Sequence, residues 1–290
     1  MLFRSDEIAV PGTPFHDLFR KMEFTQEQVG ALRDFAERET GIDFMITVPS
    51  VLTVRKCHEL GIERLKIGSS NLTNLLLLRE IARLGEEVEV YLSTGMGTVG
   101  DIETALANLG PAGKDCRLFH CTVSYPAPPE SLNLRAIPLM RTLFPGHRAG
   151  LSDHSLGSSA AVAAVALGAD MIEKHFTLDK KQEGPDHHFS AEPAELAALV
   201  KAVRDTEAAL GHGRKEPTPG EMEMRVRTRR FLVFNREVSR GTRLDPEMFA
   251  TKRVAGDGQP VAVTDVDAVC RLNAPRGYRA GEALDWRDFA

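Results

Sequence analysis

The sequence predicts an α/β fold in which parallel strands alternate with helices, followed by a small β-rich module. Two observations support this prediction. From about residue 40, short apolar β-forming runs alternate with turns and with segments of helical periodicity, as in repeated βα units. From residue 229 the pattern changes to short strands and turns. A length of 290 residues is sufficient for one large core and a small second domain.

Six runs in the first part of the chain are predicted to be strands. Each is short and apolar, and each is followed by a polar or glycine-containing turn. They end at Thr47, near Lys66, and at Ser93, Thr122, Ser152 and Phe176. Helical segments lie between them, and one of these, GSSAAVAAVALG, consists mainly of small residues that allow close packing on a sheet. An alternating parallel sheet follows from this order.

The spacing of these runs, roughly 20 to 30 residues, fits both a closed barrel and an open doubly wound sheet. The barrel is favoured because chemically capable residues follow every run, whereas an open sheet concentrates its site at one switch point. A barrel needs eight βα units, but only an irregular stretch and one helical segment, TQEQVGALRDFAERETG, precede the first run. We therefore expect a TIM (β/α) barrel that lacks its first two strands.

The predicted domain boundaries follow from changes in composition. Residues 1–210 should form the incomplete barrel, ending in a long amphipathic helix. Residues 211–228 are rich in glycine, proline and charge, and are predicted to be a linker. Residues 229–290 contain two similar phrases, NREVSRGTRLDPEMF and NAPRGYRAGEALDWRDF, each with a turn glycine before an apolar-acidic stretch. They indicate an internal pseudo-repeat in a compact β-rich domain.

Composition and charge argue against nucleic-acid and membrane partners. The net charge of -5 includes no basic stripe, and no run approaches the roughly 18 apolar residues of a membrane helix. The start of the chain, MLFRSDEIAV, lacks the basic and apolar stretches of an export signal. The four cysteines form no CxxC pair and no disulfide framework, which is typical of a reducing compartment. We expect a cytoplasmic protein.

His154 and His175 are the candidate metal ligands. They lie in the phrases GLSDHSLG and IEKHFT, after consecutive predicted strands, so a barrel would place both imidazoles at one mouth. Two such histidines suit a divalent metal ion. Either residue alone is better explained as a hydrogen-bonded loop histidine, and only the pairing favours metal binding.

Further candidates could bind an anion or a sugar. Lys66 lies inside the apolar run RLKIGSS, where a lysine is costly unless its amine reaches an anion. Ser69 follows it, and Ser93 leads into a turn before a helix, so hydroxyls and helix-start amides could hold a phosphate. Helix capping explains each hydroxyl singly. Tyr125 and Asp186 could bind a polyol, or could be a packed aromatic residue and a turn aspartate.

The phrases KIGSS, LSTGM, FHCTVSYP, GLSDHS, EKHFT and GPD, in this order, resemble the N-acetylneuraminate (sialic acid) synthase family and its legionaminic and pseudaminic acid relatives. The final module resembles the antifreeze-like, or SAF, domain of those enzymes. The resemblance implies a metal-dependent TIM barrel in which phosphoenolpyruvate condenses with the open-chain aldehyde of an N-acetylated amino sugar, such as N-acetylmannosamine. The products would be a nine-carbon 2-keto sugar acid and phosphate.

The resemblance also implies roles for individual residues. It assigns His154 and His175 to manganese or magnesium binding and, together with Lys66, to catalysis. The residues that it places against the substrates are Thr47, Lys66, Ser69, Ser93 and Ser152 for phosphoenolpyruvate, and Tyr125 and Asp186 for the sugar. It implies that Arg253 of the SAF domain enters the barrel of a second subunit, which would make the protein a domain-swapped homodimer.

The sequence departs from the family pattern in three places. Family members begin with a strand carrying an AEIG-like glutamate and a second strand ending in KFQ, and both are missing. Because MLFRSDEIA reads like the segment after KFQ, we expect an N-terminally truncated chain whose Met1 is an internal methionine. Asn71 replaces an acidic residue of many relatives, and Val254 and Ala255 replace Pro-Gly.

Two alternatives stay open beside the synthase. The chain could be a catalytically inactive paralogue that binds carbohydrate or acts as an assembly partner, since the missing strands would carry a glutamate and a phosphate-binding lysine. It could also be a related barrel aldolase or keto-acid-phosphate synthase that acts on a different aldehyde.

Overall fold

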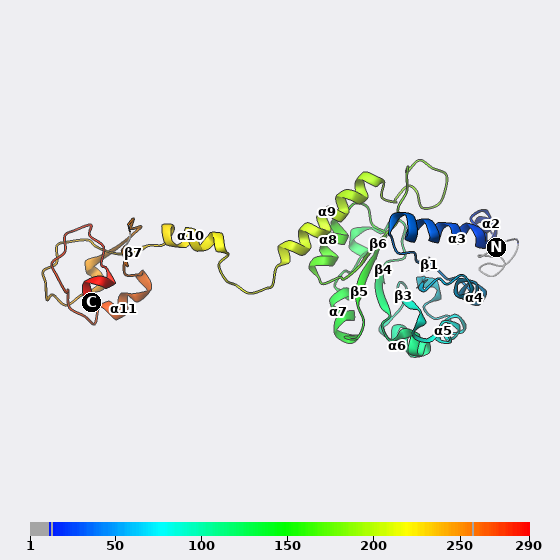
Figure 1. Ribbon diagram of the computed structural model, residues 1–290, viewed down its shortest axis with the longest axis horizontal. Helices are drawn as coiled ribbons and strands as arrows, with labels where there is room; N and C mark the ends of the chain where they lie inside the picture. The colour runs from blue at the N-terminus through cyan, green and yellow to red at the C-terminus, as the bar shows by residue number, and fades with distance from the viewer. Residues whose placement is uncertain (1–11, 13, 257) are drawn as a thin grey trace. The chain divides into compact units, whose positions relative to one another are not determined.

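The computed structural model describes residues 12, 14–256 and 258–290 (Figure 1). It divides into two compact units, Met1–Gly211 and His212–Ala290, one residue beyond the predicted end of the barrel domain. The phrase MLFRSDEIA, which suggested truncation, lies outside the described residues. Of the helices in the described part of the chain, none is long and apolar enough to cross a membrane.

A six-stranded parallel sheet forms the centre of the first unit, with its strands in sequence order. The strands are β1 (Ile46–Thr47), β2 (Arg64–Ile67), β3 (Glu89–Ser93), β4 (Arg117–Cys121), β5 (Ala149–Asp153) and β6 (Ile172–Lys174). Within the described residues, β1 and β6 form the two edges of the sheet. The predicted α/β fold is confirmed as a curled parallel half-barrel whose six strands match the six predicted runs.

Helices cover the outer side of this sheet (Figure 1). The helices are α2 (Pro14–Lys21), α3 (Gln26–Asp34), α4 (Val51–Glu59), α5 (Leu75–Ala82), α6 (Val99–Leu109), α7 (Ala136–Leu143), α8 (Ser159–Ala166) and α9 (Pro193–Leu210). Their starts are fixed locally: Thr25 and Gln28 form a capping box at α3, and Thr98 and Asp101 form one at α6. Helix α2 corrects the expectation that the segment before α3 is irregular.

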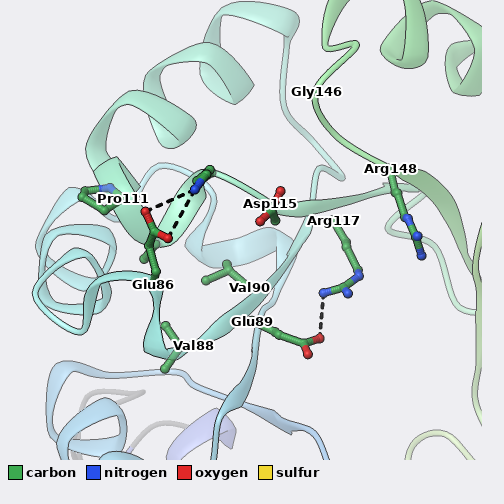
Figure 2. A pocket seen from close by; sticks show the side chains of 11 residues that line it. Glu86, Val88, Glu89, Val90, Pro111, Asp115, Arg117, Gly146 and Arg148 are labelled. Atoms are coloured by element: carbon green, nitrogen blue, oxygen red, sulfur yellow. Dashed lines mark hydrogen bonds and ion pairs between the residues drawn. The ribbon is translucent and has the colours of Figure 1, made fainter.

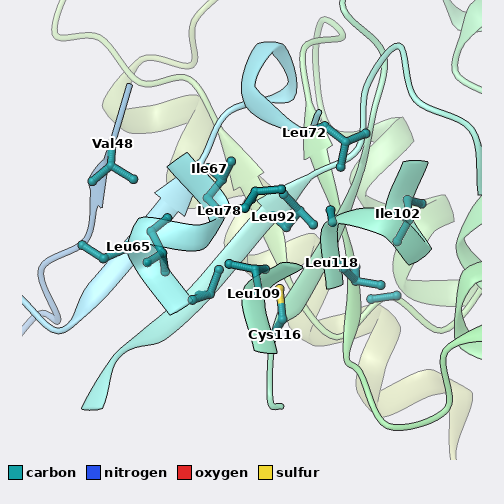
Figure 3. Close-up of a cluster of buried hydrophobic side chains, with 14 of the residues drawn as sticks. Val48, Leu65, Ile67, Leu72, Leu78, Leu92, Ile102, Leu109, Cys116 and Leu118 are labelled. Carbon is teal, nitrogen blue, oxygen red and sulfur yellow. The ribbon is translucent and has the colours of Figure 1, made fainter. Parts of the chain in front are cut away.

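The core lies between the sheet and these helices (Figure 3). Strand β2 shows the alternation that produces it, because Leu65 and Ile67 are fully buried while Arg64 and Lys66 are only partly buried. Leu65 and Ile67 belong to the same cluster as Leu78 of α5. Lys66 therefore lies on the face of the sheet that would line a barrel interior, away from the helices.

The second unit is a small module built on a two-stranded antiparallel sheet. Its elements are α10 (Pro219–Thr228), β7 (Phe231–Phe234), β8 (Phe249–Lys252) and α11 (Val266–Val269). Helix α10 corrects the expectation that residues 211–228 form only a linker. It begins where Thr218 caps the helix and Glu221 completes a capping box, with Pro219 at a position that favours proline.

The structure confirms the pseudo-repeat in this module. Val238 and Tyr278, one from each phrase, exchange two backbone hydrogen bonds of 3.0 and 2.9 Å. Gly241 and Gly281 occupy equivalent turns with φ of 83° and 87°, which glycine adopts readily. A short helical turn follows in each phrase, capped by Asp245 in the first and by Asp285 in the second.

The second of these caps gives the module an acid-sensitive contact. The side chain of Arg287, and the backbone amides of Arg287 and Gln259, lower the pKa of Asp285 to about 2 from 3.8. Because the folded-state pKa is depressed, this stabilisation is present above pH 3.8 and is lost as the pH falls towards 2. We expect Asp285→Asn to lower the melting temperature at pH 5 but not at pH 2. The exposed Asp267→Asn is the control, and equal effects at both pH values would contradict the assignment.

Candidate functional site

Most of the predicted site residues surround one pocket at the carboxyl ends of the strands. Its volume is about 210 Å³. The residues that line it are Lys66, Gly68, Ser69, Ser70, Ser93, Met96, Cys121, Val123, Tyr125, Ser152, His154 and His175. In βα barrels this end of the sheet carries the active site. Seven of the residues predicted from the sequence therefore line this one pocket, which makes it the candidate site.

Three predicted residues lie outside the lining of this pocket. Thr47 ends β1 and lies next to Gly68. A Cβ atom placed on Gly68 would be 3.9 Å from Cγ2 of Thr47. Asp186 lies in the loop after β6, with Oδ2 3.6 Å from Nδ1 of His175. Arg253 is exposed in the second unit, directly after β8.

The two histidines face each other across the pocket, with ring centroids 5.2 Å apart. Nδ1 of His154 lies 2.8 Å from the carbonyl oxygen of Thr122. In the neutral imidazole, donation of Nδ1–H to this carbonyl leaves Nε2 with a free lone pair, the arrangement found in many metal-binding histidines. Burial lowers the pKa of His175, so its imidazole is neutral near pH 7 and can also act as a ligand.

Cys121 at the end of β4 contacts His154, a relation that sequence reasoning missed. Its Sγ lies 3.8 Å from Nδ1 of His154, and the thiol is buried. Burial opposes ionisation of both groups. Their contact, together with Ser69 and Ser152 at the thiol and with the Thr122 carbonyl and Glu173 at the imidazole, leaves the pKa of Cys121 lowered and that of His154 raised. The signal in the sequence was a cysteine at the carboxyl end of a predicted strand, which the search for CxxC spacing passed over.

Lys66 has a carboxylate partner that the sequence did not reveal. Its Nζ lies 2.5 Å from Oε1 of Glu173, which comes from β6. The second oxygen, Oε2, is buried without a hydrogen-bond partner among the described residues, and so is Oγ of Ser93 in the pocket wall. Buried polar atoms without partners are rare in folded proteins. Since Ser93 lines the pocket, and Glu173 binds Lys66 of the same lining, a polar ligand in this cavity would complete the hydrogen bonding of the Ser93 hydroxyl.

Two aromatic rings pack against the histidines, and one of them, that of Tyr125, lines the pocket. The ring of Tyr125 lies 4.3 Å from that of His154, and the ring of Phe189 lies 4.9 Å from that of His175. Phe189 is buried and also contacts Tyr125 at 5.7 Å. Burial raises the pKa of Tyr125, so its hydroxyl stays protonated and can donate a hydrogen bond. Phe189 was not among the predicted residues.

A larger cavity of about 380 Å³ opens at the opposite end of the sheet, at the starts of β3 and β4 (Figure 2). Its charged side chains largely neutralise one another. Lys114 pairs with Glu86 at 3.3 Å, and Arg117 pairs with Glu89 at 2.7 Å. Among the described residues, no histidine or cysteine lines it. Because the reactive side chains lie at the carboxyl ends of the strands, we assign the site to the smaller pocket.

Comparison with known proteins shows which proteins this chain is similar to. A model of the NeuB family matches residues 6–215. The chain is 39% identical to an N,N'-diacetyllegionaminic acid synthase of Campylobacter jejuni, over 75% of this chain and 65% of the relative. It is 35% identical to a human N-acetylneuraminate-9-phosphate synthase, over 86% of this chain and 68% of the relative. The chain thus spans about two thirds of the length of these relatives.

A solved structure extends the similarity to three dimensions. The N-acetylneuraminic acid synthetase of Leptospira borgpetersenii, crystallised in complex with citrate, superposes with a TM-score of 0.69 and 34% sequence identity. The superposition covers 76% of each chain.

Proposed function

Since the chain belongs to the NeuB family, we propose that it condenses phosphoenolpyruvate with the aldehyde of an N-acetylated amino sugar, N-acetylmannosamine or a relative. The products are a nine-carbon 2-keto sugar acid and phosphate. The observation that carries the proposal is the pair His154 and His175, which shares one pocket with Lys66 and several serine hydroxyls. The synthase names of the relatives support the same class of product.

The two histidines fit a divalent cation, manganese or magnesium. His154 has Nε2 free because Nδ1 faces the Thr122 carbonyl, and the unpartnered oxygen of Glu173 leaves negative charge nearby. Within the described residues no three His, Cys, Asp or Glu side chains are grouped to hold an ion alone, so water and substrate oxygens would complete the coordination. A bound cation polarises the aldehyde carbonyl as a Lewis acid.

The remaining side chains orient phosphoenolpyruvate and manage its charge. Lys66 supplies the positive charge for the phosphate, since its ammonium reaches the end of β2 inside the pocket. Ser69 accepts the amide of Gly95 at 3.1 Å, and its hydroxyl, which also contacts Cys121, can turn to donate to an anion. The hydroxyl of Ser93 has no partner among the described residues and can donate as well. Ser152 lies beside them, and Thr47 extends the same rim from β1.

The reaction forms and breaks bonds in the following order, with these side chains transferring the protons and holding the phosphate. The vinyl carbon attacks the aldehyde carbon, and the aldehyde oxygen takes up the proton that the water of the next step gives to Glu173. Water adds at the enol carbon, and Glu173 accepts its proton on the oxygen that has no other partner. The hydroxyl of the resulting tetrahedral carbon then forms the keto group and gives its proton to the phosphate, which leaves by carbon–oxygen cleavage while Lys66 holds it. Tyr125 and Asp186, at the His175 side of the pocket, contact the sugar.

We propose that the second unit takes part in the same reaction within a homodimer. Residues 229–290 are proposed to form an SAF-like domain whose exposed Arg253 enters the mouth of the barrel of a second copy. Charge supports this docking, because the formal charge is -8 for the first unit and +3 for the second. All four cysteines are free, which supports a reducing compartment such as the cytoplasm.

The proposal is tested by supplying the purified chain with phosphoenolpyruvate, Mn²⁺ and a panel of amino-sugar aldehydes. We expect phosphate release that requires both the cation and one N-acetylated aldehyde, with a nine-carbon keto acid seen by mass spectrometry. Sugar binding without turnover would instead support the inactive paralogue. Turnover of an aldehyde that carries no acetamido group would support the related aldolase or synthase.

Gly95 provides a more local prediction. A Cβ atom at this position would lie 2.6 Å from Val123 Cγ2 and 2.8 Å from Ser69 Oγ. Gly95→Ala should therefore displace Ser69 and raise the KM for phosphoenolpyruvate by about tenfold, the loss of one hydrogen bond to a charged group. Gly100→Ala in α6 is the control, because its nearest atom is 3.8 Å away and alanine favours helices. Equal kinetics for the two variants would contradict the role of Ser69.

A further inference from the structure

A buried ion pair lies directly behind the two histidines of the pocket. Nζ of Lys174 is 2.8 Å from Oδ2 of Asp153, and their side chains are 6% and 0% exposed. The two residues are register partners at the ends of β5 and β6. His154 follows one of them and His175 follows the other, so this pair is the last cross-strand contact before both imidazoles. Since successive strand residues point to opposite faces, the pair lies on the helix side of the sheet.

Ser155 extends this ion pair into a hydrogen-bond network around His154. Its backbone amide and its hydroxyl both donate to Oδ1 of Asp153, at 2.8 and 2.6 Å. Its carbonyl oxygen accepts a second hydrogen bond from Lys174. The backbone is therefore held on both sides of His154, and the same lysine ties it to the strand that carries His175.

Stability alone does not account for such a pair. Desolvation of two charges is costly, and apolar residues of similar volume often stabilise a protein as well or better. Positioning is a role that this network can perform and that an apolar pair cannot, because it combines a fixed distance with directional hydrogen bonds to the backbone. Outer partners of metal-binding histidines commonly affect metal affinity 10- to 100-fold.

We infer that Asp153, Ser155 and Lys174 are positioning residues that set the spacing and orientation of His154 and His175. The inference rests on the proposed function where it treats these histidines as the metal-binding pair. It adds residues that touch neither substrate nor cation.

The first test is the affinity for Mn²⁺ alone, measured on the full chain from the electron paramagnetic resonance signal of the free ion. Lys174→Met should weaken binding 10- to 100-fold. The control is Arg141→Met, which removes an ion pair with Asp170 next to the other end of β6 and should change affinity less than about twofold. Asp153→Ala/Lys174→Met should regain stability relative to Lys174→Met, because no buried carboxylate is left unpaired, yet should still bind Mn²⁺ weakly. Recovery of affinity together with stability would overturn the inference.

The second test needs no metal, so it separates this inference from the proposed function. In metal-free protein, the Nδ1–H of His154 donates to the Thr122 carbonyl and should give a slowly exchanging ring proton in ¹H–¹⁵N spectra. We expect Lys174→Met to remove or shift this signal and Arg141→Met to leave it. If the unaltered chain binds no Mn²⁺, the assignment of His154 and His175 as metal ligands fails. The spectrum of the metal-free protein still tests whether Lys174 positions His154. An unchanged signal in Lys174→Met would overturn the inference.

Discussion

Replacing both His154 and His175 by alanine removes the cation-dependent reaction, with an expected fall in kcat/KM of at least about a thousandfold. A Lewis-acid cation contributes several kcal/mol to a barrier of this kind, and about 1.4 kcal/mol corresponds to a factor of ten. Because both imidazoles line the same pocket, either single substitution should already weaken Mn²⁺ binding severely. Steady-state kinetics over a range of Mn²⁺ concentrations measures the effect.

The matched control is His58→Ala, which removes an exposed imidazole from α4. It should leave kcat/KM and the dependence on Mn²⁺ unchanged. A double His154→Ala/His175→Ala variant that keeps its activity within tenfold would show that the pocket holds no catalytic cation.

Lys66→Met has the second largest expected effect, a loss of about 100- to 1,000-fold in kcat/KM. Its ammonium offers a charged hydrogen bond of about 1.5 to 3 kcal/mol to the phosphate, and the favourable charge in the pocket is lost as well. The substitution also leaves Glu173 partly buried without its partner, so we expect the free energy of unfolding to fall by about 1 to 3 kcal/mol.

The double variant Lys66→Met/Glu173→Gln separates these two effects. Removing the unpaired carboxylate should restore stability, while activity stays low because neither phosphate binding nor proton acceptance returns. Kinetics and denaturant unfolding on the same preparations provide both readings. If activity recovers together with stability, Lys66 has only a structural role.

The sheet was predictable because each strand is a short apolar run followed by a turn, and a parallel order follows from the helices between them. Positions at strand ends were predictable for the same reason, since parallel strands bring their carboxyl ends to one edge. His154 and His175 therefore met in one pocket, as expected. Helix α10 was missed because its glycine, proline and charges were taken as a linker, although Thr218 and Glu221 form a capping box.

The contacts across the sheet could not be read from the sequence. Glu173 meets Lys66 only because the sheet curls, and the two residues are 107 positions apart. Phe189 reaches His175 through the path of the loop after β6, which no periodicity describes. Lys174 resembles an ordinary strand-end lysine until its register with Asp153 is known. Pairings of this kind depend on register and strand curvature, which are properties of the folded sheet.

The most direct test of the account is a crystal structure of the chain grown with Mn²⁺ and phosphoenolpyruvate, with anomalous data for manganese. The account predicts one anomalous peak within about 2.2 Å of a ring nitrogen of both His154 and His175, close to the usual distance of a first-row metal from histidine. It predicts the phosphate of phosphoenolpyruvate beside Lys66 and Ser69. Manganese or phosphoenolpyruvate bound at the amino-terminal ends of β3 and β4, with this pocket empty, would contradict it.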